Sequence, residues 1–596
     1  MLNRFARICL VISALGLATG PAYAQGGKKA GATTTAAHDK KDQGKNKKDQ
    51  GKKDQGKKEG KKAGDAGPVD IELDEPGQAK EPTGPVVAGQ MTEEAAQAKR
   101  LFDNERWAEA ALALDRVQKG DTGDDEGNKQ IAQYNLAIAL YRLKLYQASY
   151  NIFSLVADNP NHLKFNETLL WLSKLATQLP EPADIIERVG KYKSDAIERF
   201  NNPNQHELYW QLNYLLGRYK YRNRQYEEAI RLFQNVDKQS KYYIKSQFFM
   251  GISYVQLRRS VPAVKSFNKI VAALDEGVEG VENEGRMRDL AFLSMARTYY
   301  TASIKLDDNN VPTVDATKLS AAVKYWNKID VGSEYWLDGL FEESWAYFMA
   351  GDYPRALGNI HTIQSPFFPN AVYPEADILK AVIYFSNCQY DEATTVVARF
   401  KLKYEPVKKE LESVLARYKG EGKEAELYKF LRDVRDGKAD LPDNIRPIVE
   451  TALGDRQLLR NIEYVRVLEE EENTFKSAPA SFRNSPLGGD VQDALDLAKD
   501  VAVRNAGTLA KARFQRTIDE INEHLRDSAK ILIDVTAAQR NKLEQAVQIG
   551  QVSKAESKIM GVVKPDEEHV LWPFDGEYWR DELGFYRQVV ISNCGR

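Results

Sequence analysis

The residue types that most often carry out chemistry are scattered along this chain and form no recognisable site. The six histidines are far apart: His38, His162, His206, His361, His524 and His569. His206-Glu207 begins like the zinc-binding helix His-Glu-x-x-His, but Trp210 stands where the second histidine belongs. Glu567, Glu568 and His569 are interpreted as a surface cluster. We therefore expect no metal ion and no cofactor.

The motifs that bind nucleotides or activate nucleophiles are missing as well. Gly51 to Lys58 (GKKDQGKK) has the spacing of a phosphate-binding loop, but Lys58 occupies the position where Ser or Thr holds magnesium. No strand pattern precedes it. The sequence contains no G-x-S-x-G elbow, no paired C-x-x-C and no glycine-rich dinucleotide loop. The many carboxylates leave a glycosidase-type pair open, but no compact catalytic domain is indicated. We predict that the protein is not an enzyme.

The first residues have the composition of an export signal. Arg4 and Arg7 precede the apolar run Ile8 to Ala18, and Ala22-Tyr23-Ala24 fits a small-x-small cleavage site. The apolar run is too short to cross a bilayer, and no later run of about eighteen apolar residues follows it. We predict a cleavable signal peptide over 1–24, export without a lipid anchor, and no transmembrane segment after cleavage.

Residues 25–90 are predicted to lack a packed structure. Residues 25–62 carry thirteen lysines against five acids and no large apolar side chain, so they cannot build a core. Residues 68–90 contain Pro68, Pro76, Pro82 and Pro85, which is typical of a stiffer linker. The basic tail suits an anionic cell-wall polymer, a lipid surface or the acidic body of the chain itself. A spacer without a ligand is the alternative.

Two cysteines, Cys388 and Cys594, lie outside the signal peptide. In an oxidising compartment an even number of cysteines permits one disulfide. Their separation of about 200 residues favours two unpaired thiols instead. Both alternatives stay open.

From residue 91 the chain carries a repeated helical pattern, in which a small residue is followed four positions later by a larger apolar one. These pairs are Ala110/Leu114, Ser149/Phe153, Ala229/Phe233, Ala263/Phe267, Ala322/Trp326, Ala356/Ile360 and Ala393/Val397. The intervals from Phe233 to Phe267 and from Trp326 to Ile360 are both 34 residues. An aromatic residue precedes several of the small residues by three, at Trp107, Tyr146, Tyr226, Tyr353 and Tyr390. In the unit at 246–271, Gly251 is predicted to let the second helix approach closely, with Phe267 beside it.

The pattern resembles the tetratricopeptide repeat (TPR), whose consensus is W-x2-L-G-x2-Y, then A-x3-F, then P. The unit at 246–271 lacks the tryptophan and the closing proline, but the resemblance extends over 91–400. It implies an all-α TPR helical-hairpin superhelix (solenoid). A helical, partly coiled-coil-like C-terminal region over 401–596 is expected to follow.

In TPR proteins, first-helix side chains line a concave groove that binds protein partners. Carried over by position, this implies groove residues at Tyr134, Asn135, Tyr141, Arg142, Tyr214, Arg218, Tyr221, Arg222, Phe248, Phe249, Phe341, Trp345 and Phe348. Such a groove suits an extended peptide with acidic and apolar anchors. For each aromatic residue, a place in the core between repeats is the alternative.

The repeat is interrupted twice. The 80-residue interval from Phe153 to Phe233 has room for a degenerate repeat and an insertion with Pro180 and Pro182. The 59-residue interval from Phe267 to Trp326 includes polar insertions at 275–284 and 305–313. These insertions either contact partners or are tolerated surface loops.

Beyond residue 400 the helical pattern continues without the repeat. A narrow apolar stripe of coiled-coil type comprises Phe514, Ile518, Ile521, Leu525, Ser528, Leu532 and Val535. We expect it to fold back on 441–476, with dimerisation as the alternative. The last segment is rich in aromatics, at Trp572, Phe574, Tyr578, Trp579 and Phe585. We expect these rings to be buried on the body as a cap for the solenoid, with docking on a partner as the alternative.

The exported TPR array, the helical tail and the terminal segment WPFDGEYWRDELGFYR (572–587) are together similar to periplasmic TPR proteins of myxobacteria, including those of the gliding-motility machinery. The resemblance implies a periplasmic scaffold, which could associate with the outer membrane and whose partners are periplasmic or outer-membrane proteins. The alternative function is a cell-wall-associated factor that binds anionic polymer through its tail and recruits a hydrolase. We expect no nucleic-acid partner.

Overall fold

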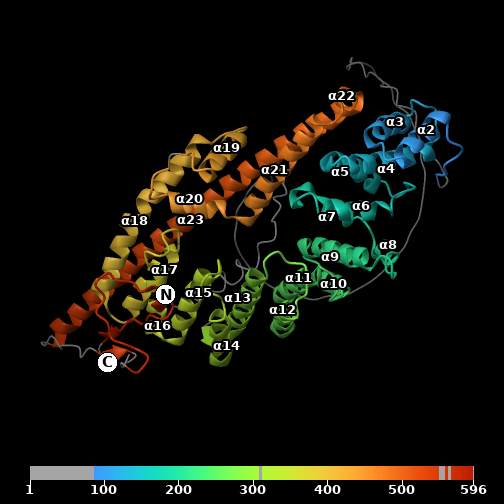
Figure 1. Ribbon diagram of the computed structural model, residues 1–596. Coiled ribbons are helices and arrows are strands. Elements are labelled where there is room, and N and C mark those ends of the chain that lie inside the picture. Colours follow the sequence, from blue (N-terminus) through green and yellow to red (C-terminus); the bar gives the residue numbers. More distant parts are fainter. Residues whose placement is uncertain (1–85, 308–311, 440, 550–557, 561–565, 595–596) are drawn as a thin grey trace, which may run out of the picture. The chain divides into compact units, whose positions relative to one another are not determined.

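The computed structural model describes residues 86–594 except 308–311, 440, 550–557 and 561–565. It is an all-α solenoid of TPR-type helical hairpins followed by a helical C-terminal region (Figure 1). The seven regular hairpins are α2 (Glu93–Asp103) with α3 (Trp107–Lys119), α4 (Glu126–Arg142) with α5 (Tyr146–Asp158), α9 (His206–Arg222) with α10 (Tyr226–Gln234), α11 (Tyr243–Gln256) with α12 (Ser260–Asp275), α13 (Glu284–Ser303) with α14 (Ala316–Trp326), α15 (Trp336–Ala350) with α16 (Tyr353–Ile363), and α17 (Pro374–Ser386) with α18 (Tyr390–Arg417). Helix α18 therefore extends past residue 400, where the repeats were expected to end.

The predicted repeat register is the register of the structure. Both members of all seven small/large pairs are buried, and each pair lies on the second helix of a hairpin. Gly251 of α11 faces Phe267 of α12: a Cβ atom added to Gly251 would lie 2.5 Å from the Phe267 ring. Gly217 of α9 meets Phe233 of α10 in the same way, at 2.6 Å. A glycine on the first helix thus makes room for the buried phenylalanine of the second.

This contact gives a stability prediction. Replacing Gly251 by alanine is expected to lower the free energy of unfolding by about 1–3 kcal/mol, because the Phe267 ring is fully buried and cannot move aside freely. Gly489, in the first turn of the long helix 486–549, is the matched control, since a Cβ there meets nothing within 4 Å. Gly489→Ala should be neutral or stabilise by up to about 1 kcal/mol. Equal losses in urea denaturation of the two variants would contradict the packing described.

Six of the hairpins turn in the same way. The residue two positions before the second helix has a positive φ: Glu105, Lys144, Arg224, Arg258, Gly351 and Cys388. At each turn the next amide donates back to the carbonyl five residues earlier, as from Leu145 to Leu140 and from Gln389 to Tyr384. This hydrogen bond ends the first helix at a residue in the left-handed conformation, after which the second helix runs antiparallel to the first.

The third unit is irregular and contains the proline insertion. It consists of α6 (Thr168–Leu175), the 3-10 turn η1 (Glu181–Ala183), α7 (Ile185–Val189) and α8 (Ser194–Glu198). The second polar insertion begins with β1 (Ile304–Leu306), which pairs antiparallel with β2 (Pro312–Val314). Both insertions interrupt the repeat where the sequence intervals indicated.

The C-terminal region folds back on the solenoid. Its helices are α19 (Glu424–Arg435), α20 (Arg446–Leu453), α21 (Arg456–Lys476), α22 (Ala480–Arg483) and α23 (Pro486–Ile549). Helix α23 packs against α21, as expected, and also against α17, α18 and α19. The stripe residues Phe514, Ile518, Ile521 and Val535 are buried in these contacts. The stripe therefore packs against helices of its own chain, as in the predicted fold-back.

Residues 566–594, here called the terminal strap, lie on α15, α16 and α17. The strap includes η2 (Arg580–Glu582) and β4 (Val590–Ser592), and β4 pairs antiparallel with β3 (Lys558–Met560). The amide of Gly584 donates to Thr362 Oγ1 at 3.0 Å, and that of Gln588 donates to the Pro354 carbonyl at 3.0 Å. Gly358 has no side chain to keep the strap backbone at Tyr586 away from α16.

The strap ends in a disulfide between Cys388 and Cys594. Of the two alternatives left open by the sequence, the structure contains the bonded pair. Separation along the chain was a poor guide, because the fold brings the two Cα atoms to 5.1 Å.

The prediction that the last segment caps the solenoid is wrong in two respects. The strap docks on the body, but on the side of α15–α17, whereas α23 covers the last hairpin. Its buried apolar residues are Leu583 and Val590, while Trp572, Phe574 and Phe585 are 51%, 53% and 71% exposed. Backbone hydrogen bonds, these two buried side chains and the disulfide fix the strap, and the rings of Phe574 and Tyr578 pack on His361 of α16 with centroids 4.6 and 4.5 Å apart.

The predicted signal peptide and almost all of the predicted tail and linker lie outside the described residues. Among the helices that are described, none is both long and apolar enough to span a membrane.

Candidate protein-binding surface

The predicted groove residues lie on first helices, but four of them are core. Tyr214 of α9 and Phe341, Trp345 and Phe348 of α15 are less than 10% exposed. The Tyr214 ring stacks on Tyr242 with centroids 5.2 Å apart. Phe341 likewise packs on Tyr373 at the start of the next hairpin, whereas Phe348 packs on Trp345 and on Tyr353 of its own hairpin. All four residues are buried, so the prediction that they line an open groove is wrong. Large aromatic side chains at such positions stabilise the fold more when they fill the gap between repeats than when they stay exposed in an open groove.

The aromatic residues that remain partly accessible are engaged with one another. The Trp171 indole donates to the Tyr134 hydroxyl at 2.9 Å, and the Tyr141 ring meets the edge of Trp171 at 5.2 Å. Burial raises the pKa of Tyr134 to about 12. Phe248 and Phe249, half-buried on α11, contact each other with centroids 6.0 Å apart. Asn135 is also half-buried, and Arg142 is exposed with its guanidinium over the Trp107 ring.

The predicted basic residues of α9 already hold an acid of the same chain. Glu181 of η1 pairs with Arg218 and Arg222, and Arg460 of α21 pairs with the same carboxylate. Burial and the nearby charges of Arg222 and Arg460 lower the pKa of Arg218 to about 9. Tyr221, the remaining predicted residue on this helix, packs against Phe249. Glu181 of this chain therefore occupies the place that was predicted for an acidic side chain of a partner.

Helix α21 also contacts the N-terminal hairpins. Glu471 accepts the amide hydrogens of Gln147 at 2.8 Å and Ala148 at 3.2 Å, which belong to the first turn of α5. The Tyr464 hydroxyl donates to Gln147 Oε1 at 2.6 Å. A carboxylate suits the free amides and the dipole of a helix N-terminus. Burial nevertheless raises the pKa of Glu471 to about 7.

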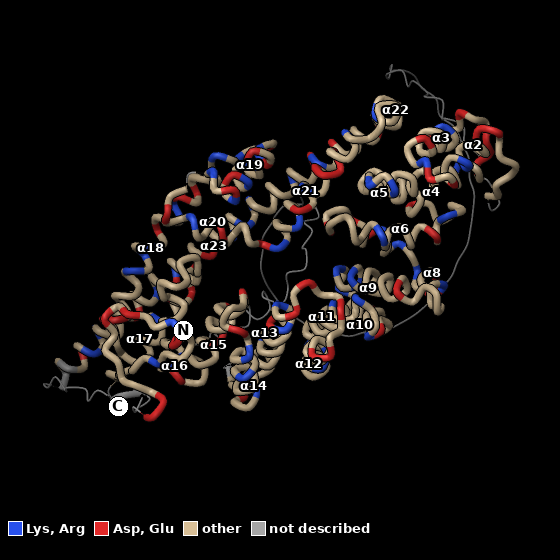
Figure 2. The backbone as a smooth tube through the Cα atoms, in the orientation of Figure 1, with Lys and Arg blue, Asp and Glu red and all other residues tan. Residues whose placement is uncertain are grey.

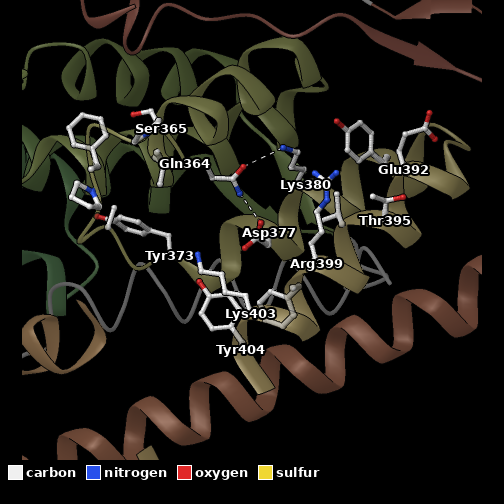
Figure 3. A pocket seen from close by; sticks show the side chains of 18 of the residues that line it. Gln364, Ser365, Tyr373, Asp377, Lys380, Glu392, Thr395, Arg399, Lys403 and Tyr404 are labelled. Carbon is white, nitrogen blue, oxygen red and sulfur yellow. Dashed lines mark hydrogen bonds between the residues drawn. The ribbon is translucent and has the colours of Figure 1, made fainter. Parts of the chain in front are cut away.

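A pocket of about 750 Å³ lies between the end of α16, α17 and α18 (Figure 3). It is lined by charged side chains and rings: Tyr373, which precedes α17; Asp377, Lys380 and Tyr384 from α17; and Asp391, Glu392, Arg399, Phe400, Lys403 and Tyr404 from α18. Side chains of the loop after α16, among them Gln364 and Phe368, complete the wall. None of the predicted groove residues lines this pocket.

The polar groups of the pocket form a short network. Gln364 Nε2 donates to Asp377 Oδ1 at 2.7 Å, and Lys380 Nζ donates to Gln364 Oε1 at 3.3 Å. Burial raises the pKa of Asp377, offset in part by Lys403 and Lys380. Burial likewise lowers the pKa of Lys380, offset by Asp377. The lining therefore carries three cations, Lys380, Arg399 and Lys403, and three carboxylates, Asp377, Asp391 and Glu392, and none of these cations forms an ion pair among the described residues.

The strap borders the same pocket. Gln588 Nε2 donates to the Tyr384 hydroxyl at 2.8 Å, and Tyr384 is a lining residue. The sequence did contain a signal for the pocket, because Tyr373, Asp377, Lys380 and Tyr384 follow each other by three or four residues on one helix face. The positions carried over from the TPR resemblance do not include this stripe.

Within the described ranges, no three His, Cys, Asp or Glu side chains lie together in a way that could hold a metal ion. No family model matches the sequence, and no curated protein matches it either.

Several solved structures share the helical-repeat character at a distance. The apo form of RapI is 11% identical, with 68% of this chain and 97% of that chain covered and a TM-score of 0.26. A Rap protein complexed with Competence and Sporulation Factor is 12% identical, with 73% and 98% covered and a TM-score of 0.22. A circular tandem repeat protein is 13% identical, with 77% and 90% covered and a TM-score of 0.10. Likenesses this remote say nothing about what the chain binds.

Proposed function

We propose that this chain is an exported, periplasmic TPR scaffold that binds other proteins of a cell-envelope assembly, such as a motility complex. The observation that carries the binding role is the pocket between α16, α17 and α18, where charged side chains and rings surround about 750 Å³ of open space. Pockets of this size that contain a few convergent polar groups are typical ligand-binding sites. The export signal, seen in the sequence alone, supports the location.

The ligand is an extended protein segment with an acidic side chain. The lining holds three cations, Lys380, Arg399 and Lys403, and three acids, Asp377, Asp391 and Glu392. None of these cations forms an ion pair among the described residues, and Asp377 is bonded to Gln364. An acidic group entering the pocket would meet Lys380 in a partly desolvated setting, where charge pairs are stronger than in water, and would meet Arg399 and Lys403 as exposed charges. The half-buried rings of Tyr373 and Phe368 provide the apolar contact that fixes such a segment.

Charge reversal tests this function. The double variant Arg399→Glu and Lys403→Glu should weaken binding of short acidic peptides roughly tenfold or more, because attraction becomes repulsion. Fluorescence anisotropy of labelled peptides graded in charge would measure the effect. The matched control is Lys409→Glu, an exposed residue of α18 that does not line the pocket.

The control should bind like the unaltered chain, and circular dichroism should show the same helix content in all variants. Binding that is unchanged by the double variant, or that shows no preference for acidic peptides, would contradict the assignment of the pocket.

A further inference from the structure

The terminal strap presents large apolar side chains to solvent. Leu571, Trp572, Trp579 and Phe585 are between 41% and 71% exposed. The rings of Trp572 and Trp579 contact each other with centroids 4.6 Å apart, so the exposed apolar surface is contiguous there. Contiguous exposed apolar side chains mark interaction sites, and tryptophan is among the residues that contribute most at interfaces.

The backbone that carries these rings is held in place. The disulfide ties the end of the strap to the body, and the amide of Gly584 donates to Thr362 Oγ1 of α16 at 3.0 Å. Within the strap, the amide of Trp579 donates to the Tyr586 hydroxyl at 2.8 Å. A surface that is ordered before binding loses less conformational entropy when a partner covers it. The strap is therefore a presented surface and not a frayed end.

The charge of the strap restricts what can cover it. Residues 566–594 contain seven carboxylates against two arginines. Of the seven, Asp566 pairs with His569. No lysine or arginine of the described chain forms an ion pair with the other six: Glu567, Glu568, Asp575, Glu577, Asp581 and Glu582. Along the helices of the body, by contrast, charges of both signs are interspersed (Figure 2).

We propose that the strap binds a lysine- or arginine-rich segment of a partner protein. A lysine ammonium or an arginine guanidinium is attracted to the face of a tryptophan or phenylalanine ring, and the methylene stem of either residue covers apolar surface. Such a segment pairs with the carboxylates and covers the exposed rings at once. None of the strap residues lines the pocket between α16, α17 and α18, so this is a second surface with the opposite charge preference.

The same charge argues against other occupants of the strap. The strap of a second copy would bring seven carboxylates of its own, and like charges repel. The negative surface of an anionic membrane would repel the strap in the same way. An uncharged partner would take the carboxylates out of water without pairing them, which is costly. A basic segment is the partner that meets none of these penalties.

Fluorescence anisotropy with the full chain tests the proposal. The probe is a short labelled peptide in which lysine alternates with serine, and two comparison peptides carry glutamine or glutamate in place of lysine. We expect the lysine peptide to bind roughly tenfold more tightly than the glutamine peptide at low salt, because several exposed ion pairs act together. The difference should disappear at about 0.5 M salt.

Two sets of variants separate the charge of the strap from its rings. The first replaces four exposed acids by their amides: Asp575, Glu577, Asp581 and Glu582. It should weaken binding of the lysine peptide roughly tenfold, since four carboxylates are lost. The second, Trp572→Leu with Trp579→Leu, should weaken binding several-fold while leaving every charge in place, because leucine has no ring face. Limited proteolysis should find the strap of both sets as resistant as that of the unaltered chain.

The control neutralises four exposed acids outside the strap: Glu405, Glu421, Asp443 and Glu450. It should bind the lysine peptide like the unaltered chain. The strap variants should bind acidic peptides like the unaltered chain, so a failure of the strap and a failure of the pocket are distinguishable.

A lysine peptide that binds no more tightly than the glutamine peptide, or that loses as much affinity in the control as in the strap variants, would overturn the proposal. Sedimentation of the full chain covers the case of a second copy. Strap-dependent dimers, with no preference for the lysine peptide, would overturn the proposal in favour of self-association.

Discussion

Replacing Cys388 by serine is expected to lower the free energy of unfolding by about 2–5 kcal/mol and to release the terminal strap. The disulfide to Cys594 joins residues separated by 206 positions, and cross-links that close long loops restrict the unfolded chain most. Serine would occupy the same backbone conformation as Cys388, whose φ is 56°, so the substitution removes the bond and little else. Urea denaturation under non-reducing conditions measures the loss.

Reduction provides the matched control for this prediction. Treating the unaltered protein with dithiothreitol should reproduce the lower denaturation midpoint and should make the strap sensitive to limited proteolysis. The serine variant should not respond to the reductant. An unaltered protein whose midpoint and protease sensitivity are the same with and without reductant would show that the bond does not hold the strap.

Replacing Glu375 by glutamine is expected to stabilise the protein at alkaline pH by roughly 2–4 kcal/mol. Glu375 lies in the first turn of α17 and has a buried oxygen, Oε1, without a hydrogen-bond partner among the described residues. Burial, and then the charges of Glu523, Asp527 and Glu520 on α23, raise its pKa to about 8. The folded protein therefore favours the protonated acid. Its contribution to stability is complete below the usual pKa near 4.5 and is lost as the pH rises through 8.

Urea denaturation at pH 5 and pH 9 tests this sign. The unaltered chain should lose more stability between the two values than Glu375→Gln, and the two proteins should differ least at the lower pH. Glu405→Gln, an exposed position on α18, serves as the control and should follow the unaltered chain at both values. A variant that is less stable than the unaltered chain at pH 9 would contradict the uncompensated burial of Glu375.

Local periodicity was sufficient to predict the hairpins. The small/large pairs are a property of neighbouring helices, so Ala263 with Phe267 and Ala322 with Trp326 reveal the fold directly. The turns were less visible, because positions with positive φ are occupied by Glu105, Lys144 and Arg224, residue types that give no sign of a left-handed conformation. The repeat itself imposes that conformation.

Contacts between distant parts of the chain could not be read in the same way. Glu471 belongs to the acidic run Glu469 to Glu472, which looks like a solvated stretch, yet its side chain is buried against α5 more than three hundred residues away. The groove prediction failed for a related reason. Whether Phe341 or Trp345 faces a ligand or the next hairpin depends on the spacing of the hairpins, which a single sequence does not contain.

The most direct test of the binding role is hydrogen–deuterium exchange of the full chain with and without a bound acidic peptide. If the pocket between α16, α17 and α18 is the site, amides around 363–404 should become protected, and the Arg399→Glu and Lys403→Glu variant should lose that protection. Protection confined to α4, α9 and α11, or no protection in 363–404 at saturating peptide, would contradict it.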